Sequence, residues 1–109
     1  MFSANDVVNI NKRFSDGHLA NKNSLEFAIS SIKHKTSLDQ ISYLVRAIVV
    51  DHVFSDGNKR TAAAILIAFF IELEIGFDPD KIAKIILDIS RKNISDINKI
   101  RRMIKNAIR

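Results

Sequence analysis

The chain contains no cysteine and no tryptophan, and only three glycines, one proline and one tyrosine occur among its 109 residues. The absence of cysteine excludes a disulfide framework and a thiolate-ligated metal site, and it is compatible with the reducing cytoplasm, where we expect the protein. The scarcity of glycine and proline favours long regular elements over many turns. The sequence does not open with a basic segment followed by an apolar stretch, so we expect no secretory signal.

The apolar content is sufficient for one buried core. Hydrophobic residues make up 47% of the chain, and its length is typical of a single domain, which we expect to span residues 1–109. The apolar run over residues 62–71 is much shorter than the roughly 20 residues of a membrane-spanning helix, so it predicts a buried helix. The net charge of +5 and the pI of about 9.8 are compatible with an anionic partner.

Apolar residues recur at helical spacing along most of the chain, and no segment alternates as a strand would. The predicted fold class is therefore all-α, a compact bundle of about six helices. The first helix should end near residue 15. Four of the expected helix starts are marked by capping residues, namely Ser3, Asn23 or Ser24, Asp78 followed by Pro79, and Ser95.

The third helix has a recognisable start and a notable end. Ser37 and Gln40 match a capping box, in which each side chain bonds the other residue's backbone amide. From Ile41 the apolar face continues at helical spacing to His52, which we therefore place at the end of a buried face. Turn-forming residues follow, so this helix should stop near Phe54.

The segment HVFSDGNKR, residues 52–60, connects the third helix to a fourth that is expected over residues 58–75 and closed by Gly76. The start of a helix presents unpaired backbone amides and the positive end of its dipole, and both attract anions. The loop between the two central helices is therefore a candidate phosphate site.

The side chains around this helix start fit phosphoryl or nucleotidyl transfer. Gly57 allows a tight turn and close approach of a ligand, and Lys59 and Arg60 add positive charge. Asp56 can hold Mg²⁺ that also contacts phosphate, and His52 can take a proton from an attacking hydroxyl. The same residues also have a purely structural explanation, as a polar turn with exposed cations, and composition alone does not decide between the two.

The order of the residues carries more information than their types. Residues 52–60 resemble the Fic/Doc signature His-x-Phe-x-(Asp/Glu)-(Gly/Ala)-Asn-x-Arg, and Gly17 with SLEFAISSI, residues 24–32, is similar to the segment that precedes this motif in Doc-like proteins. The resemblance extends over most of residues 5–78 and implies ATP and Mg²⁺ as cofactors. It implies the following roles: His52 as general base, Asp56 as Mg²⁺ ligand, Gly57, Asn58, Lys59 and Arg60 as the anion hole, and Phe54 as anchor of the loop.

Two departures from the family pattern indicate the subtype. AMP-transferring members usually have glycine after the motif asparagine and a second arginine three residues beyond the first, where this chain has Lys59 and Ala63. The form Asn-Lys-Arg-Thr-Ala is similar to Doc toxins, which pass the γ-phosphate of ATP to a protein hydroxyl, in the known case on elongation factor Tu. The resemblance thus favours a kinase-like toxin, with AMP transfer as the alternative.

Two further features concern partners. The self-inhibitory motif of the family, (Ser/Thr)-x-x-x-Glu-(Gly/Asn), has no match in the sequence, so we expect restraint by a separate antitoxin. The segment that forms a target-binding flap in the family, here residues 33–36, is very short and leaves catalytic competence open. A helical module that binds nucleic acid through basic residues 91–109, or an inactive family member, is the remaining alternative.

Overall fold

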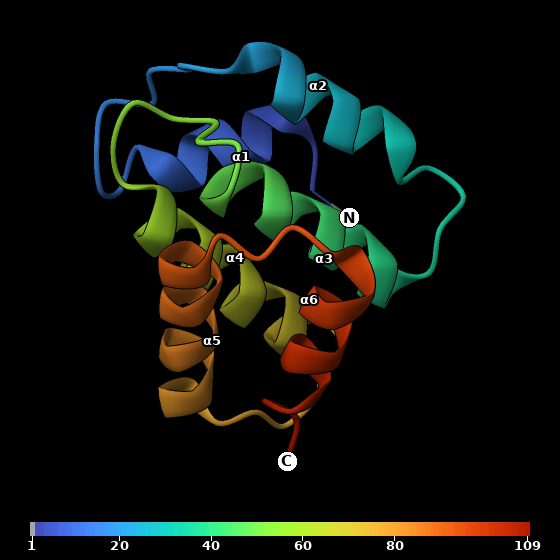
Figure 1. Ribbon diagram of the computed structural model, residues 1–109. Helices are drawn as coiled ribbons and strands as arrows, with labels where there is room; N and C mark the ends of the chain where they lie inside the picture. The colour runs from blue at the N-terminus through green and yellow to red at the C-terminus, as the bar shows by residue number, and fades with distance from the viewer. Residues whose placement is uncertain (1) are drawn as a thin grey trace.

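The computed structural model describes residues 2–109 and consists of six helices (Figure 1). They are α1 (Ala4–Asn11), α2 (Lys22–Ser31), α3 (Ser37–Val49), α4 (Asn58–Glu72), α5 (Pro79–Lys92) and α6 (Ile97–Lys105). Two isolated β-bridges are the only extended pairings among these residues, and no strand occurs in them. The predicted all-α bundle is therefore confirmed. No helix in this part of the chain has the length and apolar character needed to cross a bilayer.

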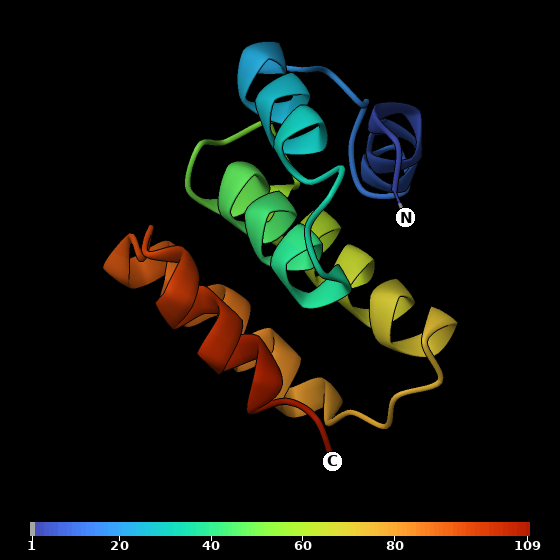
Figure 2. The ribbon, with the colours of Figure 1, turned by 90° about the vertical axis from the view of Figure 1, so that its right-hand side faces the viewer.

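The helices form three pairs stacked on one another (Figures 1 and 2). The central pair is α3 and α4, which pack against each other. On one side α1 contacts α4 and α2 contacts α3, whereas on the other side α5 contacts α4 and α6 contacts α3. Burial on both sides explains why the apolar residues of α4 surround the helix instead of forming one stripe.

Two of the predicted helix starts are confirmed with their capping residues. Ser3 caps α1 in a capping box: its hydroxyl accepts from the Asp6 amide at 3.1 Å, and the Asp6 carboxylate accepts from the Ser3 amide at 2.8 Å. These hydrogen bonds stabilise the ionised carboxylate and lower the pKa of Asp6 below its usual value. Asp78 caps α5 with Pro79 at its first position, and the isoleucine stripe on the inner face of this helix, Ile82, Ile85, Ile86 and Ile89, is buried.

Two other predicted caps are wrong by one to three residues. Asn21, rather than Asn23 or Ser24, caps α2, because its side chain is also held by the Asp51 carbonyl across the fold. Asp96, rather than Ser95, caps α6, since its carboxylate reaches two first-turn amides.

The predicted capping box at the start of α3 is also wrong. The Thr36 hydroxyl, not that of Ser37, accepts from the Asp39 amide at 3.3 Å. The Gln40 side chain donates to the Lys35 carbonyl at 2.9 Å instead of closing a box with Ser37. Thr and Ser both serve as N-caps, so the local sequence does not decide whether Thr36 or Ser37 caps α3, and tertiary packing does.

The predicted helix ends are also too late. The first helix ends at Asn11 rather than near residue 15, because the chain turns there and reaches Gly17, which has a φ of 76°. The fourth ends at Glu72 rather than Ile75, and Glu74, with a φ of 56°, takes the left-handed conformation expected of Gly76.

The end of α3 differs most from the prediction. The helix stops at Val49, and His52, with a φ of 52°, lies exposed in the loop rather than on a buried face. Val53 and Phe54 are buried in its place, at 0% and 1% exposure. Because burying the Phe54 ring and pairing the Val53 carbonyl with the 17–21 segment require an extended chain, these tertiary contacts end the helix before His52.

Candidate functional site

Two loops lie side by side at one end of the central helix pair (Figure 1). The loop after α1 and the loop between α3 and α4 are joined by an antiparallel bridge between Leu19 and Phe54. The Val53 carbonyl accepts from two amides of the first loop, those of Ala20 at 2.9 Å and Asn21 at 3.0 Å. Thus the segment before α2 holds the 52–55 segment in position from outside the helices.

The side chain of Asn58 closes the loop between α3 and α4. Its Oδ1 accepts from the Phe54 amide at 3.0 Å, and its Nδ2 donates to the Phe54 carbonyl at 2.8 Å. Since Phe54 is itself buried, this pair fixes the loop to the core. The Asn58 side chain is therefore used to shape the loop, and the backbone amide is the part of this residue that can meet a ligand.

The start of α4 differs from the start of every other helix in residues 2–109. The helix begins at Asn58, as expected, and its N-cap is Gly57, which makes no side-chain capping bond. In the other five helices a side-chain oxygen accepts from a first-turn amide; the residues are Ser3, Asn21, Thr36, Asp78 and Asp96. The first amides of a helix have no intrahelical acceptor, so those of α4 are open to an external anion.

All six residues singled out from the sequence meet at one cleft. His52, Asp56, Gly57, Asn58, Lys59 and Arg60 line a hollow of about 450 Å³, together with Val49, Ser55 and Ser90. This volume lies within the usual range of small-molecule sites. The cleft is polar and positively charged at the start of α4, and Ser90 brings α5 into its wall.

Asp56 is the residue at the cleft that could hold a magnesium ion. Asp56 is exposed there next to the amides of the α4 start. In the described residues, no three histidine, aspartate or glutamate side chains converge on one point. Mg²⁺ commonly binds through one or two carboxylates plus water and substrate phosphates. Asp56 could thus hold Mg²⁺ together with phosphate oxygens of a ligand. The ion would then neutralise part of the negative charge of the phosphate during transfer.

Sequence reasoning missed Asn11, which lies beneath the cleft. The residue is fully buried, and its side chain bonds the Asp56 carbonyl and the Thr61 hydroxyl, each at 3.0 Å. By residue type alone, it resembles an exposed asparagine near a helix end. The available signal is weak: the position is one where the apolar stripe of α1 would continue.

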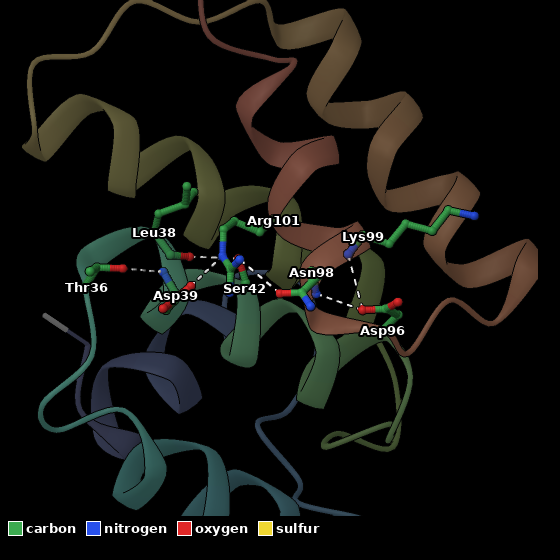
Figure 3. Close-up of polar contacts among 8 residues, drawn as sticks. All are labelled: Thr36, Leu38, Asp39, Ser42, Asp96, Asn98, Lys99 and Arg101. Atoms are coloured by element: carbon green, nitrogen blue, oxygen red, sulfur yellow. Dashed lines mark hydrogen bonds and ion pairs between the residues drawn. The ribbon is translucent and has the colours of Figure 1, made fainter.

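The basic C-terminal region is only partly free for an external ligand. Arg101 of α6 lies between Asp39 of α3 and Asn98, and it bonds both (Figure 3). This cation therefore links two helices instead of presenting its charge to a partner. Lys99 and Arg102 are exposed beside a shallow hollow on α6.

Comparison with known protein families gives one match. A model described as the Fic/DOC family matches residues 2–70. The matched region covers α1, α2, α3, both loops of the cleft and nearly all of α4. Neither a curated protein nor a solved structure matches the chain significantly.

Proposed function

Because the chain belongs to the Fic/DOC family of transferases that act on proteins, we propose that it transfers the γ-phosphate of ATP to a hydroxyl of a target protein. The observation that carries the proposal is the cleft, where a histidine, a carboxylate and an uncapped helix start lie together. Phosphoryl transfer depends on positioning and charge neutralisation, and these are the properties that such a site offers.

In the proposed reaction, His52 accepts the proton of the target hydroxyl. The hydroxyl oxygen forms a bond to the γ-phosphorus while the bond between that phosphorus and the β–γ bridging oxygen breaks, and ADP leaves. The amides at the start of α4, with Lys59 and Arg60, neutralise the phosphate oxygens, and Asp56 would hold Mg²⁺, which would supply further positive charge. The exposure of His52 supports this role, since a base for a protein hydroxyl has to be reached by another protein.

The choice of γ-phosphate rather than AMP rests on Lys59 and Ala63. Residues three apart lie on one face of a helix. A second arginine at position 63 would therefore lie on the same face of α4 as Arg60, one turn further from the start of the helix. Ala63 carries no charge and is half-buried. The contact that AMP-transferring members are expected to make to outer phosphates is therefore missing, which favours the Doc-like reaction.

The proposal extends to partners. We propose that the target is a translation factor such as elongation factor Tu, that a separate antitoxin restrains the protein, and that the reaction takes place in the cytoplasm. These three points rest on the resemblance to Doc-like toxins and on the lack of a self-inhibitory motif. A pull-down of the His52→Ala variant from its native cells would identify both partners.

The decisive experiment is a transfer assay in cell lysate with two ATP preparations, one labelled on the α- and one on the γ-phosphate. Transfer of only the γ label to a protein, lost in His52→Ala, is the expected result. Transfer of the α label would assign AMP transfer instead. No labelled protein from either preparation, when the purified chain is folded and Mg²⁺ is present, would contradict catalysis by this chain.

A matched control variant distinguishes a function of the cleft from a function of the basic C-terminal region. Arg102→Ala removes an exposed cation of α6 and leaves the cleft intact, so it should not change γ transfer. If the protein instead acts by binding nucleic acid, Arg102→Ala should weaken a salt-sensitive complex that His52→Ala leaves unchanged.

A further inference from the structure

The side chain of Asn11 uses all of its hydrogen-bonding groups within the fold. Nδ2 donates to the Asp56 carbonyl and to the Thr61 hydroxyl, both at 3.0 Å, and Oδ1 accepts from the Gly17 amide at 2.9 Å. These partners fix the orientation of the amide, because a carbonyl cannot donate and an N–H cannot accept. Asn11 is 0% exposed, so no water substitutes for a lost bond without rearrangement.

The bond to Asp56 determines where the next amide points. The peptide between Asp56 and Gly57 is trans, and in a trans peptide the carbonyl and the N–H point in opposite directions. Since the carbonyl is held toward Asn11, the Gly57 N–H points away from the buried side of the loop. No acceptor for this N–H occurs among residues 2–109.

The bond to Thr61 fixes the same loop relative to α4. Thr61 is buried in the first turn of α4, and its amide donates to the Gly57 carbonyl at 2.9 Å. Asn11 therefore connects the residue before the N-cap to the helix that follows it. Its Nδ2 would also lie only 3.2 Å from a Cβ at position 57, so the loop is closely packed on the amide.

The third bond reaches the other loop of the cleft. Gly17, whose amide donates to Asn11, begins the segment that supports residues 52–55. One residue later, the His18 carbonyl accepts from the Ser55 amide at 3.1 Å. A single buried amide thus joins α1, α4 and both loops.

We infer that Asn11 is a positioning residue for phosphate: it holds the Asp56–Gly57 peptide so that the Gly57 amide and the first amides of α4 face the phosphate groups of the nucleotide. The inference rests on the proposed function, because it assigns a ligand to those amides. It differs from a purely structural role, in which Asn11 would affect stability but not the affinity of the folded protein for a nucleotide.

The test compares three variants of the full chain. Asn11→Ala removes all three bonds, and Thr61→Val removes one of them while the bond to Asp56 remains. Ser42→Ala is the matched control: Ser42 is also 0% exposed, and its hydroxyl donates to the Leu38 carbonyl within α3 (Figure 3). Neither Ser42 nor Leu38 lines the cleft.

Binding of MgATP is measured by calorimetry at a temperature at which each variant is fully folded, and amide exchange of residues 55–61 is measured without ligand. We expect Asn11→Ala to weaken binding by about tenfold or more, since a freed peptide has to be reordered around the ligand. Thr61→Val should weaken it about threefold, and Ser42→Ala should leave it unchanged. Exchange of the amide at position 61, which donates to the Gly57 carbonyl, should increase in the first two variants only.

Equal MgATP affinity in Asn11→Ala and the wild type would overturn the inference. If Asn11→Ala does not fold, Thr61→Val decides: unchanged MgATP affinity together with unchanged exchange of the amide at position 61 would reject the inference. If the wild type itself does not bind MgATP, the proposed function fails. The positioning role is then judged by exchange alone, and equal exchange of the Thr61 amide in Asn11→Ala and Ser42→Ala would reject that role as well.

Discussion

Replacing Gly57 by alanine should destabilise the protein, and the structure allows the size of the effect to be worked out. Gly57 has a φ of 77°, in the left-handed region, where an L-residue is strained by about 1–2 kcal/mol. A Cβ there would lie 3.2 Å from Asn11 Nδ2 and 3.4 Å from Ser15 Cβ. Asn11 is held by three hydrogen bonds and cannot move freely, so the crowding adds roughly another 1 kcal/mol.

One effect acts in the opposite direction. Alanine restricts the unfolded chain more than glycine does, which stabilises the folded state by up to about 1 kcal/mol. The net loss in the free energy of unfolding is thus about 2 kcal/mol, or a decrease in Tm of about 8 °C for a domain of this size.

Gly76→Ala is the matched control for this measurement. Gly76 does not have a positive φ, and a Cβ there would meet only Arg109 Cβ at 3.7 Å, an ordinary contact. Urea denaturation followed by circular dichroism should therefore show a stability equal to or slightly above that of the wild type. If Gly57→Ala and Gly76→Ala unfold at the same urea concentration, the argument from backbone strain at the start of α4 is refuted.

Three further outcomes are expected. Phe54→Ala should lower the free energy of unfolding by roughly 3–5 kcal/mol in urea titrations because the ring is buried, whereas Phe27→Ala, at 63% exposure, should change it by less than about 0.5 kcal/mol. A double-mutant cycle with Asp39→Asn and Arg101→Gln should give a coupling free energy of about 1 kcal/mol that decreases at 1 M salt. A coupling free energy that stays the same at 1 M salt would contradict an ionic link between α3 and α6. Because the pKa of Asp6 is lowered in the folded state, its cap on α1 should be fully present above about pH 4 and lost as the pH falls through that lowered value. NMR amide shifts of α1 should record this change, and Asp6→Asn should abolish it.

The helices were predictable where local chemistry alone determines them. Asp78 and Pro79 start α5 because the carboxylate accepts from a nearby amide and proline needs no acceptor for an N–H at that position. The isoleucine stripe of α5 follows from its spacing, and all four of its residues are buried. These features depend on residues that are close in sequence.

The surroundings of His52 were not predictable from periodicity, since the helix ends through contacts with distant residues. The Val53 carbonyl takes its donors from Ala20 and Asn21, more than 30 positions earlier, and no pattern within residues 41–54 indicates this. Asn11 was missed for the same reason, because two of its three partners, Asp56 and Thr61, are 45 and 50 positions away. The candidate site was found through the order of residues 52–60, whereas its support comes from other parts of the chain.

The place of Ser90 in the cleft wall has a consequence for protein engineering. The family match ends at residue 70, within α4, yet α5 and α6 cover the far sides of α4 and α3, and Ser90 belongs to α5. A fragment limited to the matched region would expose the inner faces of both central helices to water and should aggregate. Grafting α5 and α6 from another member of the family would, in contrast, preserve the motif and replace one wall of the entrance. Chimeras of this kind offer a way to alter which molecules enter the cleft without changing any residue of the motif.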